Sequence, residues 1–296
     1  MKAILLAVLL LFSKAAVAAL SVFACEPEWA ALAKELGGEK LEIYTATTAL
    51  QDPHYIEARP SLIAKARSAD LLICTGADLE VGWLPILLNQ SGNARIQSGQ
   101  PGYLEAARLV AKLEIPKRLD RALGDVHPQG NPHVHLDPRN LIPIAQEMGA
   151  RLTQLDPANA EHYRERLARF LERWESAIAR WEKDAAALKG VTVVSHHRNW
   201  SYLYGWLGMV ESATLEPRPG IPPSPGHLSQ LIAQQKANPA KMVIRAAYND
   251  PKPSISFAER VNIPAVVLPY TVGGSDAAKD LFDLFEDSVR RLLDAA

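Results

Sequence analysis

Residues 158–188 read ANAEHYRERLARFLERWESAIARWEKDAAAL, and this stretch decides the fold class of the chain. Its apolar residues recur at spacings of three and four, the pattern of an amphipathic helix: Tyr163, Leu167, Phe170, Trp174, Ala177, Trp181, Ala185 and Leu188. Asp156-Pro157 precedes the pattern and Gly190 follows it, which marks both ends of the helix. A helix of about 31 residues is about 46 Å long, so it spans more than one domain. We therefore predict a rigid connecting helix over residues 158–189.

On both sides of this helix, short runs rich in branched apolar residues alternate with helical stretches. Before the helix, the expected strands are residues 20–24, 41–46 and 70–74. After it, the expected strands are residues 191–195, 210–215, 242–245 and 265–268, and a closing helix is expected over residues 277–293. Such alternation is typical of βα units around a parallel sheet. The sequence thus predicts two α/β lobes, an N-terminal one over residues 20–157 and a C-terminal one over residues 190–296, joined by the connecting helix.

The first residues have the pattern of a secretory signal peptide. Met1-Lys2 precedes an apolar run over residues 3–12, and the small residues Ala16-Val17-Ala18 follow. A membrane-spanning helix needs about 20 apolar residues, more than this run provides. We predict a signal peptide over residues 1–19, cleaved after Ala18 or Ala19, and a periplasmic mature protein.

The two cysteines of the chain, Cys25 and Cys74, each follow a predicted strand. Disulfides persist in exported proteins, and the ends of parallel strands meet at one edge of a sheet, so we predict a Cys25–Cys74 bridge. Two buried free thiols are the alternative. A second alternative makes Val22-Phe23-Ala24-Cys25 a lipid-attachment box, which the bulky Phe23 disfavours.

The overall composition excludes several classes of protein. The formal net charge is −1, 48% of the residues are hydrophobic and 22% are charged, which are ordinary proportions for a globular protein. Phosphate backbones select basic stripes, and the chain has no long run of Lys and Arg, so we expect no nucleic-acid partner. Small molecules, ions or proteins remain as ligands.

The distribution of the eight histidines carries the most information about function. His54 follows one predicted strand, His133 and His135 lie in a loop before a helix, and His197 follows another strand. Ligands of open α/β sheets bind beyond the carboxyl ends of strands, so these side chains are candidates for one site. Imidazole suits zinc, copper, iron or nickel. Because His197 follows the connecting helix and the others precede it, a shared metal site must lie between the lobes.

A carboxylate could complete this site. Asp276, in the glycine-flanked run of residues 273–276, lies after the last predicted strand. A helix cap is the alternative role for this aspartate.

These motifs resemble the zinc-type metal-binding solute-binding proteins of bacterial ABC importers. Asp52-Pro53-His54, residues 131–138, His197 and Asp276 stand in the order of that family's ligand motifs. The resemblance implies two lobes on a rigid helix and a divalent metal held by His54, His133, His197 and Asp276. It also implies delivery to an inner-membrane ABC permease. We expect zinc rather than manganese, since manganese prefers oxygen ligands, and we expect a monomer, with a metallochaperone as a further candidate partner.

Zinc-type relatives often carry a long loop rich in histidine and acidic residues before the second motif, where this chain has only residues 125–130. The resemblance therefore makes His127 and His135 candidates for auxiliary metal capture. Exposed loop histidines without a role are the alternative.

Two other functions remain open. His133-Val134-His135-Leu136-Asp137 matches the H-x-H-x-D core of metallohydrolases, in which a metal activates water. Pro138 stands where such enzymes have a further histidine, and a tetrahedral site of three histidines and Asp276 leaves no position for water, so we predict no enzyme. A metal-binding adhesin would share the fold and differ only in its partner.

Overall fold

The computed structural model describes residues 19–116 and 127–296, and it contains two parallel four-stranded sheets. In the first sheet the strand order is β2-β1-β3-β4, with β1 (Leu20–Ala24), β2 (Leu41–Thr45), β3 (Leu71–Cys74) and β4 (Tyr103–Glu105). In the second the order is β6-β5-β7-β8, with β5 (Thr192–Ser195), β6 (Val210–Thr214), β7 (Met242–Ala246) and β8 (Ala265–Leu268). The predicted α/β fold with parallel sheets is confirmed. The predicted signal peptide lies outside the described residues, apart from Ala19.

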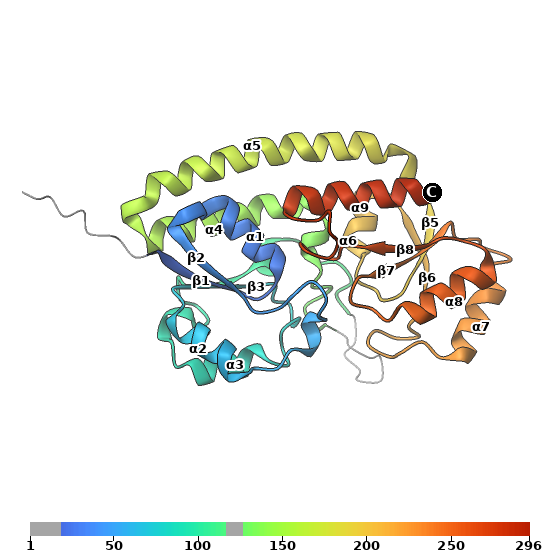
Figure 1. Cartoon of the computed structure of the whole chain (residues 1–296), viewed down its shortest axis with the longest axis horizontal. Coiled ribbons are helices and arrows are strands. Elements are labelled where there is room, and N and C mark those ends of the chain that lie inside the picture. The colour runs from blue at the N-terminus through green and yellow to red at the C-terminus, as the bar shows by residue number, and fades with distance from the viewer. Residues whose placement is uncertain (1–18, 117–126) are drawn as a thin grey trace, which may run out of the picture.

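Helices flank both sheets (Figure 1). Those of the first half of the chain are α1 (Pro27–Gly37), α2 (Pro60–Ser68), α3 (Leu84–Ser91) and α4 (Leu141–Leu155). Those of the second half are α6 (Ser201–Leu207), α7 (Pro225–Gln234), α8 (Pro251–Val261) and α9 (Leu281–Ala295). Several of them, including α1, α2 and α8, have proline in the first turn, where its missing N–H costs no hydrogen bond. No helix in the described ranges is long and apolar enough to cross a membrane.

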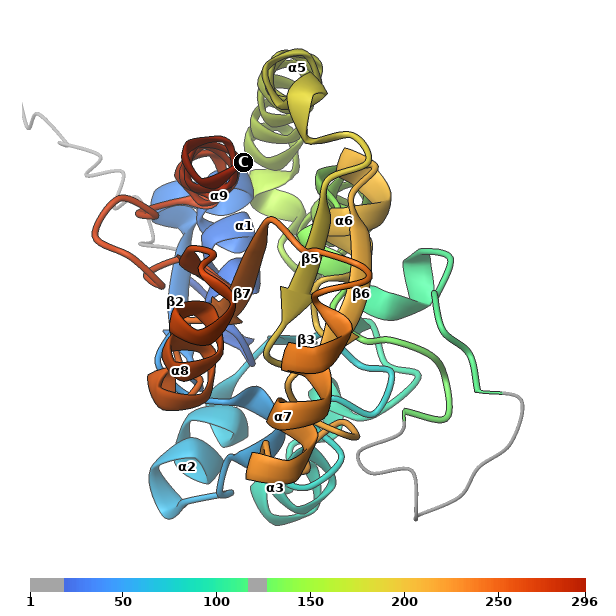
Figure 2. The same cartoon turned by 90° about the vertical axis from the view of Figure 1, so that its right-hand side faces the viewer.

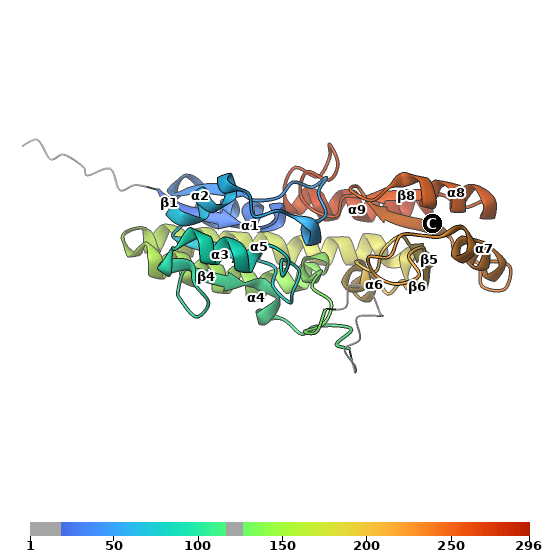
Figure 3. The same cartoon turned by 90° about the horizontal axis from the view of Figure 1, so that it is seen from below.

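The long helix α5 (Ala160–Asp184) runs along both lobes (Figures 1 and 3). Short 3-10 turns precede it at Pro157–Asn159 and follow it at Ala185–Leu188. α5 packs against α1 and α4 of the first lobe and against α9 of the second, and Figure 2 shows α5 and α9 on the same side of the molecule. One helix therefore supports both sheets.

An aromatic cluster holds α5 to α9. The ring centroids of Trp174 and Phe282 are 4.9 Å apart, and those of Trp181 and Phe285 are 5.3 Å apart. The indole N–H of Trp181 donates to Glu286 at 2.8 Å, so this buried ring also has its hydrogen bond. Large buried aromatic rings contribute strongly to packing energy, and these rings fix the second lobe on the helix.

The closing helix begins later than the sequence predicts. α9 starts at Leu281, and the Asp280 side chain caps it by accepting the backbone N–H of Asp283 at 2.9 Å. Residues 273–280 form turns instead, in which the Gly273 N–H donates to the Ala278 carbonyl. The prediction of helix from residue 277 is therefore wrong, and Asp276 is not the cap of this helix.

The predicted disulfide is present in the first lobe. Cys25 and Cys74 are bridged, with their Cα atoms 4.8 Å apart, and both side chains are fully buried. Cys25 directly follows β1 and Cys74 ends β3, and these neighbouring parallel strands bring the two residues to the same edge of the sheet.

Candidate metal centre

Three of the predicted ligands meet between the lobes. His54, His133 and His197 each offer one ring nitrogen, and these nitrogens all lie within 4.8 Å of one another. The ring centroids are 5.7 Å apart for His54 and His133, 5.9 Å for His54 and His197, and 6.0 Å for His133 and His197. The three rings lie at interplanar angles of 69° to 79° to one another. We call these three residues the histidine cluster.

A short 3-10 turn, Pro53–Tyr55, positions His54. The Asp52 carboxylate accepts the backbone N–H of His54 at 3.0 Å and lies 2.7 Å from its Nδ1. Trp83 holds the turn in place, because its indole N–H donates to the Pro53 carbonyl at 3.1 Å. Burial disfavours ionisation of Asp52, but the hydrogen bonds and charge of His54 outweigh it and leave the Asp52 pKa below its ordinary value. A carboxylate therefore orients this imidazole.

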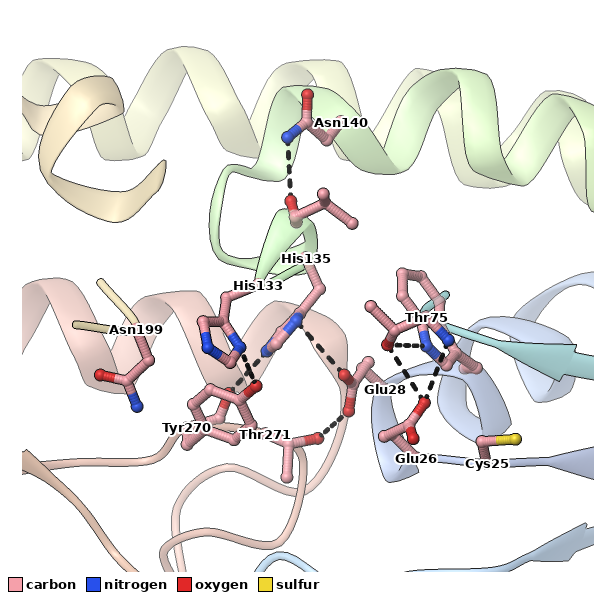
Figure 4. Close-up of polar contacts among 12 residues, drawn as sticks. Cys25, Glu26, Glu28, Thr75, His133, His135, Asn140, Asn199, Tyr270 and Thr271 are labelled. Carbon is pink, nitrogen blue, oxygen red and sulfur yellow. Dashed lines mark hydrogen bonds and ion pairs between the residues drawn. The ribbon is translucent and has the colours of Figure 1, made fainter. Parts of the chain in front are cut away.

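His133 lies deepest of the three, with 1% of its surface exposed. The Asn131 side chain accepts its backbone N–H at 3.0 Å, and its Nδ1 lies 2.6 Å from the hydroxyl of Tyr270, which follows β8 in the other lobe (Figure 4). Burial, followed by the neighbouring imidazoles of His54, His197 and His127, holds the pKa of His133 well below its ordinary value. This ring is therefore neutral at neutral pH and able to donate a lone pair.

His197 follows β5 and is held by the proline-rich segment after β6. Its Nδ1 lies 2.7 Å from the carboxylate of Glu216. That carboxylate also accepts the backbone N–H of Gly220 at 2.9 Å, and the Glu216 N–H donates to the His196 carbonyl at 3.1 Å. The neighbouring His196 is not part of the cluster.

The three rings share one arrangement. In each of them Nδ1 faces an oxygen: a carboxylate at His54 and His197, and a phenol at His133. Metal-binding histidines usually donate one ring N–H to such an oxygen, which fixes the tautomer and presents the other nitrogen to the metal. In such an arrangement Nε2 of each ring is the nitrogen that a metal ion would take.

A fourth imidazole, that of His127, lies beside His54 without being a member of the histidine cluster. His127 Nε2 lies 3.2 Å from His54 Nε2, and the ring centroids of His127 are 5.2 Å from His54 and 6.4 Å from His133. Four nitrogens bound tetrahedrally to zinc at about 2.0 Å would be about 3.3 Å apart. His127 also lines the pocket on which His133 and His197 open.

His135 lies elsewhere. It is buried, its Nε2 lies 3.0 Å from the Tyr270 carbonyl, and its Nδ1 faces Glu28 at 3.3 Å (Figure 4). Asp137 accepts hydrogen bonds from Arg139 instead of facing His133. The three polar residues of the H-x-H-x-D pattern are therefore not brought together, and His135 is not placed at the pocket.

Asp276 is also outside the group of mutually close ligand atoms. It is an exposed residue of the turns after β8 and is not a member of the group formed by His54, His133 and His197. Backbone hydrogen bonds hold these turns together, including Gly274 N–H to the Thr271 carbonyl at 2.9 Å.

Sequence reasoning missed Glu216 and Tyr270, which orient His197 and His133. Both follow strands of the second sheet, and β6 is the neighbour of β5, which precedes His197. The strand-end rule that selected the histidines would have found them too.

The fold and the site define the class of two-lobed metal-binding proteins, and histidine side chains from both lobes come together in this chain. The chain belongs to the family described as the zinc-uptake complex component A, periplasmic, whose model matches residues 22–295. This family consists of substrate-binding proteins, and nothing in the site supports the hydrolase alternative.

Individual relatives agree with this assignment. A metal ABC transporter substrate-binding lipoprotein, ScbA of Streptococcus cristatus, is 29% identical over 52% of this chain and 47% of its own length. The manganese ABC transporter substrate-binding lipoprotein PsaA of Streptococcus mitis is 21% identical over 88% of this chain and 83% of its own. The crystal structure of ZnuA superposes with a TM-score of 0.78 at 22% identity, covering 94% of this chain and 99% of that one. A Mn-bound periplasmic metal-binding protein from Candidatus Liberibacter asiaticus has a TM-score of 0.73 at 17% identity, over 93% and 98% of the two chains.

Proposed function

We propose that this protein captures Zn²⁺ after export and delivers it to an ABC permease of the inner membrane. The observation that carries the proposal is the convergence of imidazoles from both lobes, with the Nδ1 of three of them held by oxygens. The adhesin alternative has no observation in its favour, since it differs only in the partner.

The donor set supports zinc over manganese. Imidazole nitrogen is a good ligand for zinc, whereas manganese prefers carboxylate, carbonyl and water oxygens. Relatives of this chain are named for manganese, so the donors of this chain must decide between the two metals. Its predicted carboxylate ligand, Asp276, is exposed, and the side chain beside the cluster is a fourth imidazole, His127.

The metal assignment is tested by titrating the metal-free protein. Most nitrogen sites bind zinc more tightly than manganese, so the order of the two affinities is not diagnostic. We expect one zinc per chain by calorimetry. Free Mn²⁺ measured by electron paramagnetic resonance should remain at the level of a protein-free control. Stoichiometric uptake of Mn²⁺ at micromolar concentration would contradict the assignment to zinc.

Export is part of the proposal. We propose cleavage after Ala18 or Ala19, since strand β1 begins at Leu20. Cleavage before Cys25 would remove β1, which pairs with both β2 and β3, and Cys25 itself is in the disulfide. These features favour a cleaved leader over lipid attachment at Cys25. Delivery is tested by zinc uptake in chelator-limited cells, which should need both this chain and its permease.

The proposed ligands of the ion are His54, His133 and His197, with His127 as the fourth donor. His127→Ala should weaken zinc binding, because water must replace a nitrogen that is already 3.2 Å from that of His54. Asp276→Ala, at an exposed turn, should leave affinity unchanged and serves as the matched control. Competition with a chelating dye measures both. Loss of binding in Asp276→Ala with none in His127→Ala would restore the carboxylate as fourth ligand.

Zinc affinity should fall as the solution is acidified from about pH 7 to about pH 5. Metal binds only the neutral imidazole, and an ordinary imidazole has a pKa near 6.5, so protons compete with the metal in this range. Because burial and neighbouring imidazoles lower the pKa of His133, this ligand stays neutral further into the acid range. With four imidazole ligands, fewer than four protons should therefore be displaced per zinc at mildly acidic pH. Calorimetry in buffers of different ionisation enthalpy measures this number, and an affinity independent of pH would contradict the imidazole site.

A further inference from the structure

A second group of potential metal ligands lies in the core of the first lobe. The sulfurs of Cys25 and Cys74 and a carboxylate oxygen of Glu80 all lie within 4.8 Å of one another. All three residues are buried, with exposed fractions of 0%, 0% and 2%. The group shares no residue with the histidine cluster, and the disulfide currently joins its two sulfurs.

A tight turn after β3 holds Glu80 in this place. Residues Ala77 and Asp78 have φ values of 51° and 65°, a region that non-glycine residues seldom adopt. The turn brings the Glu80 carboxylate back under the strand end, where it accepts the backbone N–H of Thr75 at 2.7 Å and of Gly76 at 3.0 Å. The carboxylate is therefore fixed beside the bridge by the backbone rather than by a flexible contact.

A second carboxyl group lies next to Glu80. One oxygen of Glu26 accepts the Thr75 hydroxyl at 3.1 Å, and Figure 4 shows Glu26 beside Cys25. The other oxygen, Oε1, is buried without a hydrogen-bond partner in the described part of the chain. Burial raises the pKa of Glu80 to about 7 and that of Glu26 well above its ordinary value. A buried carboxyl oxygen without a hydrogen-bond partner is costly, so a cation bound beside it would be favourable.

We propose that Cys25, Cys74 and Glu80 form a second site for a thiophilic divalent ion, Zn²⁺ or Cd²⁺, whenever the disulfide is absent. The thiols exist before oxidation in the exported chain, or after an external phosphine has reduced the bridge. In that reduction the phosphine takes the oxygen of one water and becomes its oxide, and the two sulfurs take up the two electrons and the two protons of that water as thiols. The ion then displaces one proton from each thiol and binds two thiolates and the carboxylate. Formation of the disulfide removes both sulfur ligands and closes the site.

The geometry is compatible with this chemistry. Zinc binds thiolate at about 2.3 Å and carboxylate at about 2.0 to 2.2 Å, so two sulfurs in a tetrahedral site are about 3.8 Å apart. Rotation of the two cysteine side chains can supply that separation while the Cα atoms remain near their present 4.8 Å. Because the donors are buried, the ion must enter while the chain folds and would leave slowly. The bridge would thus prevent cargo metal from being trapped in the core.

The test uses the full mature chain with His54, His127, His133 and His197 replaced by alanine, which removes the proposed transport site. This protein is refolded without oxygen in the presence of a phosphine and Co²⁺. We expect one Co²⁺ per chain, thiolate-to-cobalt charge-transfer bands in the near ultraviolet, and displacement of the cobalt by Cd²⁺. The same protein refolded with its disulfide intact should show none of these.

Two variants in the same background separate the ligands. Cys25→Ser with Cys74→Ser should abolish the bands. Glu80→Gln keeps the size of the side chain but not its charge. It should weaken binding by at least the roughly 10- to 100-fold that loss of a supporting residue costs at metal sites. Equal affinity in Glu80→Gln, or no charge-transfer bands in the reduced protein, would overturn the proposal. So would a reduced chain that stays unfolded by circular dichroism when Cd²⁺ is added. This test does not depend on the proposed zinc-transport function, because the four histidines of that site are replaced in every protein used here.

Discussion

Replacing His133 by alanine should abolish tight zinc binding while the protein stays folded. His133 is the most buried of the three clustered histidines, and its ring is held by Tyr270 of the other lobe. The substitution removes a ligand nitrogen at a buried position. The loss of zinc affinity should therefore exceed the roughly 10- to 100-fold caused by removing a residue that only supports a ligand. Calorimetric titration of the metal-free variant with Zn²⁺ measures the effect.

The matched control is His227→Ala. His227 lies in α7 and its ring contacts the Thr214 carbonyl, so it is a structural histidine outside the cluster. Its removal should leave zinc affinity unchanged. Tyr270→Phe is the companion variant, which should weaken binding less than His133→Ala because it removes only the hydroxyl that orients the ring. If His133→Ala bound zinc as tightly as the unmodified protein, the histidine cluster would not be the site.

Replacing both Cys25 and Cys74 by serine should lower the free energy of unfolding by about 4 kcal/mol. The bridge joins residues 49 positions apart, and closing a loop of that length restricts the unfolded chain strongly. The serine hydroxyls would also be buried, since both positions are fully inaccessible. Urea unfolding under metal-free conditions measures the change.

The control for this experiment is the unmodified chain with and without a phosphine reductant. Reduction should reproduce most of the loss seen in the double serine variant, because both remove the same cross-link. A change below about 1 kcal/mol in both would show that the unfolded chain gains little freedom, contrary to the loop-closure account.

Local sequence patterns were sufficient to predict most of the helices and strands. β1 and β8 occur at the predicted residues, because branched apolar runs bounded by turn residues leave few alternatives. The three-residue strand β4 was missed: it is too short for any periodicity and exists because Leu72 and Ile73 of β3 pair with it. The start of α9 was predicted too early because several aspartates could cap a helix, and only packing selected Asp280.

Some features of the candidate site follow from local sequence patterns, and others depend on the folded chain. Local pattern was enough to predict that His54, His133 and His197 follow strands or precede helices at places where sheets present ligands, and that Cys25 and Cys74 share an edge. These properties depend on local pattern and on the rule for strand ends. The approach of His127 to His54, the absence of Asp276 and His135 from the cluster, and the contacts of Tyr270 and Glu216 with the rings are visible only in the folded chain. Those contacts join residues far apart in the chain, and their distances depend on how two lobes pack on one helix, which no local pattern records.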